Sequence, residues 1–212
     1  MTTHEATISH STTPTSVNVS AGPAADDPRL AFAKAVALCG QVIAAVQPEQ
    51  LANPTPCTEF DVDALLDHLD LVLRRIAAIG RDEGPFSIVE HRDIAHADRM
   101  AAWTEAAHEV QAAWSDASVL DEPRTLSWTV MSGRDALGMY TSELVVHTWD
   151  LAQATGQRPA WDDEVVALAY DTMTAGLPFT ERPADVPFAD VVVVPADAPA
   201  IARLVGWTGR QP

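Results

Sequence analysis

Apolar residues recur at helical spacing through most of the chain beyond residue 27. The first such stretch follows Asp27 and Pro28, a capping residue and a proline suited to a first turn, and predicts a helix that ends near Val46. A second helix is predicted from Asp61 to Gly80, because a broad apolar stripe follows the capping aspartate. A third is predicted over 98–117, where Met, Trp and Val residues share one side.

The second half of the chain is also largely helical in pattern. Residues 119–132 are rich in β-branched and aromatic side chains, and we expect them to be extended within a long crossover connection. Further helices are predicted from Ser132 or Gly133 to Gly156, over 162–175, and over 199–207. Residues 191–194 have the composition of a strand, but a proline follows at once and the sequence offers no partner strand.

Long amphipathic helices joined by at least one long connection are typical of an all-α bundle. We therefore expect residues 28–212 to form one domain, a four-helix bundle with a crossover connection and a short C-terminal extension. Residues 1–27 are predicted to be a disordered tail, since ten of the first twenty are Ser or Thr and no apolar periodicity is present.

Charge and cysteine content narrow the function. The 212 residues include 30 acidic and 13 basic side chains, a formal net charge of −17 that would repel phosphate backbones and anionic lipid. Nucleic acid and membranes are therefore not expected as partners. Two cysteines cannot form a disulfide framework, and neither a signal peptide nor a membrane-spanning segment is visible. We expect a cytoplasmic protein.

Three ionisable side chains fall on or beside helical faces that are otherwise apolar. His68 lies between Leu65 and Val72, while Glu143 and His147 are four residues apart and point the same way. Each has an ordinary explanation, as a hydrogen-bonded core histidine or an exposed helix pair. Together they favour a divalent metal ion, because burial of a carboxylate is costly without a compensating charge and no Lys or Arg lies one turn from Glu143.

Two imidazoles and one carboxylate are known from open catalytic zinc sites, and they also suit Fe²⁺ or Ni²⁺. Two neighbouring residues could take part. Asp150 follows His147 by three positions and could orient it, or it could be an exposed or capping residue. Cys57 lies just before a predicted helix N-terminus, where a thiolate is favoured, but a packed loop thiol is the alternative.

These residues lie in segments that resemble a known family. The segments are Thr55–Val62 followed by Leu65–His68, and Ser142–Ala152, and they are similar to the DinB-like helical superfamily. More narrowly, they resemble the metal-binding domain of mycothiol-dependent maleylpyruvate isomerase and its short actinobacterial relatives. Residues 194–199 with 203–204 and 208–210 resemble the end of that domain, so the likeness covers roughly residues 29–211.

The resemblance implies a four-helix bundle that holds zinc or another divalent ion through His68, Glu143 and His147. It also implies that a low-molecular-weight thiol such as mycothiol takes the open coordination position, where the metal stabilises its thiolate. The isomerase has a further C-terminal domain that helps to form its active site, and we expect no room for one in this chain. The isomerase reaction is therefore not carried over.

Three functions remain open at this point. The first is a metal-dependent thiol transferase or isomerase that acts on a small-molecule thiol or electrophile. The second is a metal-binding module without turnover, such as a sensor or stress protein. The third is a helical interaction protein that holds no metal. A homodimer would be compatible with each.

Overall fold

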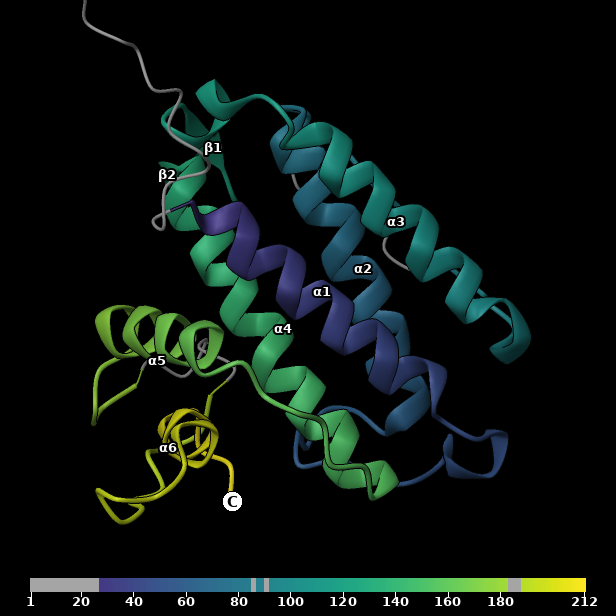
Figure 1. Ribbon diagram of the computed structural model, residues 1–212, viewed down its shortest axis with the longest axis vertical. Coiled ribbons are helices and arrows are strands. Elements are labelled where there is room, and N and C mark those ends of the chain that lie inside the picture. The colour runs from purple at the N-terminus through teal and green to yellow at the C-terminus, as the bar shows by residue number, and fades with distance from the viewer. Residues whose placement is uncertain (1–26, 85–86, 90–91, 183–187) are drawn as a thin grey trace, which may run out of the picture.

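A computed structural model describes residues 27–84, 87–89, 92–182 and 188–212, and the chain is mostly helical (Figure 1). The predicted tail, apart from Asp27, lies outside the described residues. The helices are α1 (Pro28–Ala44), α2 (Val62–Gly80), α3 (Arg99–Ala113), α4 (Gly133–Thr155), α5 (Asp163–Gly176) and α6 (Ala200–Trp207). Short 3₁₀ helices occupy Pro48–Gln50, His96–Asp98 and Ala117–Leu120, and a two-stranded sheet joins β1 (Pro123–Thr125) to β2 (Val130–Ser132). All six predicted helices are therefore confirmed, with differences at their ends.

Polar caps explain why four of the helices begin where they do. The side chains of Asp27, Asp61, Ser132 and Asp162 each accept a hydrogen bond from a backbone N–H in the first turn of α1, α2, α4 and α5. These bonds satisfy donors that have no partner inside the helix. At the other end of α4, Gly156 adopts a left-handed conformation with φ 72°, which suits a residue without a side chain.

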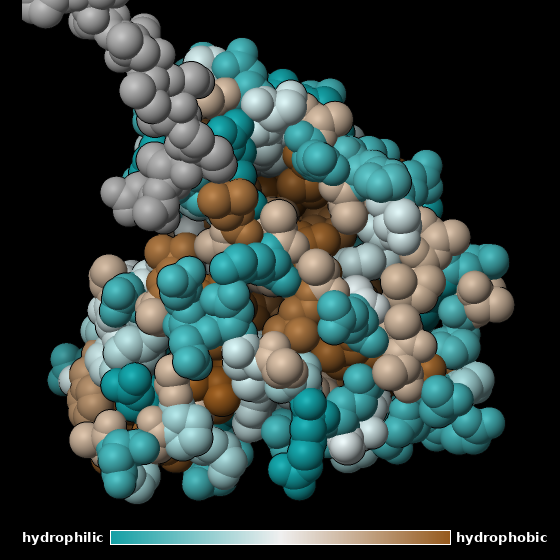
Figure 2. Space-filling view, viewed as in Figure 1, coloured by the Kyte–Doolittle hydropathy of each residue, from teal (hydrophilic) through white to brown (hydrophobic). Residues whose placement is uncertain are grey.

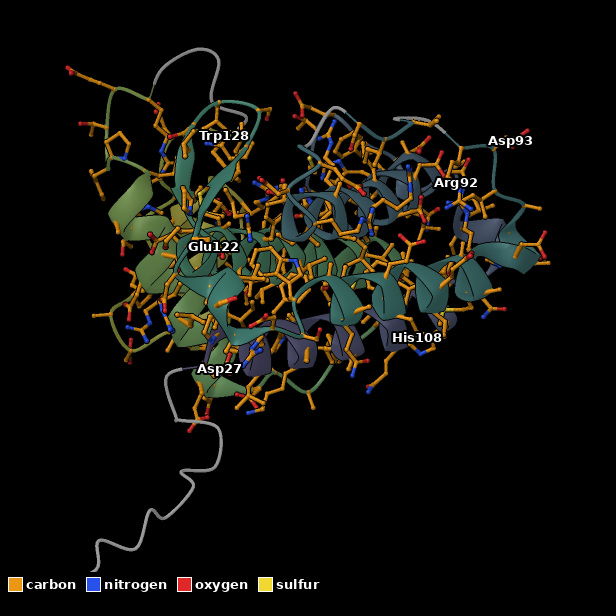
Figure 3. The ribbon with its side chains drawn as sticks, turned by 90° about the horizontal axis from the view of Figure 1, so that it is seen from above. Asp27, Arg92, Asp93, His108, Glu122 and Trp128 are labelled. Atoms are coloured by element: carbon orange, nitrogen blue, oxygen red, sulfur yellow. The ribbon has the colours of Figure 1, made fainter. Side chains whose placement is uncertain are left out.

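Three segments differ from the sequence prediction or refine it. The third helix ends at Ala113 instead of near residue 117, because Trp114 turns inward and donates its indole N–H to the carbonyl of Ile76 at 2.9 Å. The segment over 119–132, expected to be extended, instead begins in the 3₁₀ helix Ala117–Leu120 and then forms an antiparallel hairpin, with Trp128 exposed between the strands (Figure 3). Residues 191–194 form no strand, although the backbone N–H of Val192 donates to the carbonyl of Gly206 at 2.9 Å.

The helices pack around α4. Helices α1 to α4 run alongside one another, with α4 against α1 and α2, and α3 against α2 (Figure 1). Helix α5 lies across α4, and α6 packs against α5 and also contacts α4. One contiguous apolar core joins these elements, and its largest fully buried side chains come mainly from α2 and α4. Within the described residues, no helix is long and apolar enough to cross a membrane.

Candidate metal centre

The structure brings His68 of α2 together with Glu143 and His147 of α4. The Nε2 atom of His68 lies 3.0 Å from Oε1 of Glu143, and Nε2 of His147 lies 3.7 Å from the same oxygen. One donor atom from each residue lies within 4.8 Å of the other two. The two helices therefore offer two imidazoles and one carboxylate to a common point.

Helical spacing places these side chains at the edge of the core. His68 lies between Leu65 and Leu69, which are fully buried, and Glu143 precedes Leu144, which is fully buried as well. The Glu143 side chain keeps 30% of its exposure and that of His68 keeps 18%, whereas His147 is buried. The cluster is therefore anchored in the apolar interior and open to solvent on the Glu143 side.

The separations suit a small divalent cation. In tetrahedral zinc sites the bonds are about 2.0–2.2 Å, which places neighbouring ligand atoms about 3.4 Å apart. The separations of 3.0 and 3.7 Å to Glu143 Oε1 lie on either side of this value. An ion at the common point would therefore need only small adjustments of the three side chains.

Asp150 orients His147 through Nδ1, the ring nitrogen that does not face Glu143. Its Oδ2 atom lies 3.0 Å from Nδ1 of His147, and Arg210 donates to both carboxylate oxygens, from Nη2 at 2.9 Å and from Nε at 3.2 Å. Asp150 is fully buried. A carboxylate that accepts the Nδ1 proton leaves the lone pair of Nε2 directed at Glu143, as in many histidine ligands of metals.

The charges around Glu143 keep it ionised. Burial alone would raise its pKa, but the hydrogen bond with His68 and the electrostatic interactions with His147, His68 and Arg210 outweigh this effect and lower the pKa to about 2. Burial likewise acts to raise the pKa of Asp150, and its bonds to His147 and Arg210 lower it overall. Both groups therefore carry negative charge near neutral pH.

Two contacts were not predicted from the sequence. Phe60 stacks on the ring of His68, with centroids 4.8 Å apart and an angle of 27° between the planes, and it limits how that imidazole can turn. Arg210 reaches Asp150 across 60 positions in the chain. The helical period signals neither contact, because Phe60 lies before the N-cap of the helix that carries His68, and Arg210 comes from a distant segment.

Cys57 lies close to the same histidine. Its sulfur, together with donor atoms of His147 and Asp150, forms a second group in which all atoms are within 4.8 Å. Burial raises the pKa of the Cys57 thiol, which favours a packed thiol over a reactive thiolate. The carboxylate of Asp150 is already engaged by His147 and Arg210, so this second group is the weaker candidate for a metal.

The chain is therefore a mostly helical protein with a candidate metal centre. Two histidines and one glutamate form this centre between α2 and α4. The comparisons with known proteins identify its family. The chain belongs to the family described as mycothiol maleylpyruvate isomerase N-terminal domain, which matches residues 32–152 and thus spans all three cluster residues.

Full-length relatives extend the match beyond this domain. Uncharacterized proteins from two strains of Mycobacterium tuberculosis are each 30% identical to this chain over 192 residues. The match covers 87% of this chain and 98% of either relative, so the relatives have nearly the same extent. No solved structure matches the chain significantly.

Proposed function

We propose that the protein binds one divalent metal ion through His68, Glu143 and His147, in a DinB-like four-helix bundle made of α1 to α4. Zinc is the first choice, and Ni²⁺ or Fe²⁺ would suit the same donors. The observation that carries the proposal is the approach of the two imidazole nitrogens, from His68 and His147, to Glu143 Oε1 at 3.0 and 3.7 Å. The Asp150–Arg210 pair behind His147 supports it, because ligand histidines are commonly oriented in this way.

We further propose that the site serves a thiol-dependent transferase or isomerase reaction, with mycothiol or a similar small thiol as co-substrate and a small electrophile as acceptor. The family name supports the thiol. A bound divalent cation would supply stabilisation of a thiolate at neutral pH. Glu143 would balance the charge, Asp150 would hold His147 in position, and the partial exposure of Glu143 would admit the co-substrate.

A metal-binding protein without turnover is the second candidate. Two further titratable side chains lie beside the cluster in the described part of the chain. Burial raises the pKa of the Cys57 thiol, and burial together with the charge of Glu143 raises the pKa of Tyr140 to about 12. Both therefore stay protonated near neutral pH and neither is a ready general base, which a simple metal store or sensor would not need. The two candidates share the metal site and differ only in chemistry.

Elemental analysis of protein purified without an affinity tag tests the shared part. We expect about one zinc, nickel or iron ion per chain in the wild type, and metal affinity reduced at least about tenfold in Glu143→Gln, which removes the charge and keeps the shape. His108→Ala is the matched control, because His108 is an exposed histidine on α3. Equal metal affinity in Glu143→Gln and the wild type, measured by competition with a chelator, would refute the site.

Thiol consumption separates the two candidates. Metal-loaded wild type is incubated with mycothiol and a panel of small electrophiles, beside His68→Ala. The enzyme proposal predicts consumption in the wild type well above that in His68→Ala. Metal uptake without such consumption supports the non-catalytic module. The expected cytoplasmic location and homodimer remain predictions that fractionation and sedimentation would test.

A further inference from the structure

A long hollow runs along α5 on the side that faces α1 and α4. It has a volume of about 1570 Å³, larger than the roughly 300–1,000 Å³ of ordinary small-molecule pockets. Its lining follows one side of α5 from Glu164 to Gly176, a distance of about 18 Å at helical rise. The hollow is therefore a groove suited to an elongated ligand.

The walls of this groove are mainly apolar. Half-buried side chains line it from α4, α5 and the segments that follow, including Met139, Leu168, Leu177 and Phe188. Apolar surface is also visible between α1 and α5, bordered by hydrophilic side chains (Figure 2). Methionine and leucine walls adapt to the shape of a flexible apolar body.

The charged rim is predominantly acidic. Asp27, Asp135, Glu164 and Asp171 line the groove, against the cations Lys34 and Arg134. The ammonium of Lys34 already lies 2.8 Å from Asp162 and 3.8 Å from Glu164. The acidic excess disfavours an anionic ligand body. The pairing of Asp27 with Arg29 at 2.6 Å and of Glu164 with Lys34 reduces the attraction for a cationic one, so a neutral body is the best match.

One end of the groove meets the candidate metal centre. Asp135, Met139 and Glu143 follow at four-residue steps on one side of α4, and all three line the groove. Glu143 is also the residue whose Oε1 lies 3.0 Å from His68. From Asp135 to Glu143 the helix rises about 12 Å, so a ligand along this face would reach from the rim to the cluster.

We propose that the groove along α5 binds the acceptor substrate, and that this substrate is a neutral, elongated, apolar small molecule whose polar end lies at Glu143. The inference rests on the proposed function and deepens it by naming the class of substrate. This proposal explains why an apolar groove and the His68–Glu143–His147 cluster have Glu143 in common.

A neutral fluorescent probe tests the groove without turnover. The purified full chain, with its metal content measured, is titrated with N-phenyl-1-naphthylamine, and the probe is displaced by n-butanol, n-hexanol, n-octanol and n-decanol. We expect the affinity to rise about twofold to fourfold for each added CH₂ group, as partial to complete burial of its apolar surface requires. An affinity that does not depend on chain length would overturn the proposal.

A pair of tryptophan substitutions on α5 locates the binding. Ala175 is exposed and lines the groove, whereas Ala167 is exposed on the same helix and does not line it. Ala175→Trp should fill the groove and weaken probe binding about tenfold or more, and Ala167→Trp should leave it nearly unchanged. Equal affinities in the two variants would place the probe elsewhere and contradict the inference.

Head groups test the link to the metal centre. Because a thiol is also more apolar than the matching alcohol, the wild type and Glu143→Gln are compared. In wild type shown to contain metal, the preference of the groove for n-octanethiol over n-octanol should be larger than in Glu143→Gln. An equal preference in the two proteins would show that the groove does not lead to the metal. If no metal is bound but Ala175→Trp still blocks the probe selectively, the proposed function fails and the apolar groove stands.

Discussion

At the scale of single residues, the Asp150–Arg210 pair determines how His147 is held. Asp150 is fully buried, and Arg210 is buried beside it with two hydrogen bonds to its carboxylate. Arg210 also lies 5.6 Å from the ring centroid of Phe188. The guanidinium thus compensates a charge that could not otherwise remain in the interior.

Arg210→Ala should be strongly destabilising. It would leave the Asp150 carboxylate buried without its charged partner, for which we expect a loss of about 3–5 kcal/mol in the free energy of unfolding. Urea denaturation measures this loss. The double variant Asp150→Asn, Arg210→Met should recover part of it, and a single variant as stable as the wild type would contradict the role given to the pair.

The two thiols should be unreactive in the folded protein. Burial raises the pKa of Cys39 to about 12 and also raises that of Cys57. At pH 7 we therefore expect neither to react rapidly with Ellman's reagent until urea unfolds the chain, after which both should react. Rapid modification of one thiol in the native protein, absent from Cys57→Ser, would restore Cys57 as a reactive group.

The sequence predicts the positions of some site residues better than those of others. The helical pattern places His68, Glu143 and His147 at the edge of an apolar face, so their convergence could be expected. Phe60 and Arg210 could not be expected, because their partners come from packing between segments that share no local period.

At the scale of secondary-structure elements, two glycines set how closely the helices approach. A Cβ atom on Gly80 of α2 would lie 2.6 Å from Nε1 of Trp114, and one on Gly40 of α1 would lie 2.7 Å from Nε1 of Trp103. The indole of Trp114 also donates to Ile76 in α2. These tryptophans can therefore seat against α1 and α2 only where no side chain projects.

Gly80→Ala should lower stability although alanine favours helices by about 1 kcal/mol. The added methyl group would push Trp114 away from its hydrogen bond, and we expect a net loss of about 1–3 kcal/mol in thermal or urea unfolding. Gly176→Ala is the control, because nothing lies within 4 Å of its Cβ position. A stabilised Gly80→Ala variant would show that the indole can move freely.

The Asp27 cap of α1 should contribute stability that depends on pH. Its carboxylate is bonded to the Arg29 side chain and to the backbone N–H of the same residue, which together hold its pKa below the ordinary value. Because the folded pKa is depressed, the contribution is complete above the ordinary aspartate pKa of about 3.9 and is lost as pH falls through the folded pKa.

Urea unfolding of the wild type and Asp27→Ala over a range of pH measures this contribution. We expect a difference of about 1 kcal/mol near neutral pH that narrows in acid. A difference that stays constant down to the acid limit of folding would assign the effect to packing instead of charge.

Helix beginnings were predicted well because capping residues mark them, as at Asp61 and Asp162. The end of α3 was not, since it depends on the inward turn of Trp114 onto another helix. The hairpin between 123 and 132 also escaped prediction, because a crossover and a hairpin share the same β-branched composition.

At the scale of the whole molecule, α4 links the core, the cluster and the groove. It packs against α1, α2 and α5, and it contributes Glu143 both to the His68–His147 cluster and to the groove. The family match over residues 32–152 contains α4 up to Ala152, whereas Arg210 lies outside that stretch. The C-terminal segment thus completes the support of a site whose donors all come from the matched region.

The central claim is that His68, Glu143 and His147 together hold one divalent ion, and X-ray absorption at the metal edge tests it most directly. For the zinc-loaded full chain, the account predicts two imidazole nitrogens with oxygen ligands and no sulfur at about 2.3 Å. Loss of one imidazole in His68→Ala should follow. A sulfur ligand from Cys57, or an unchanged spectrum in His68→Ala, would contradict the assignment.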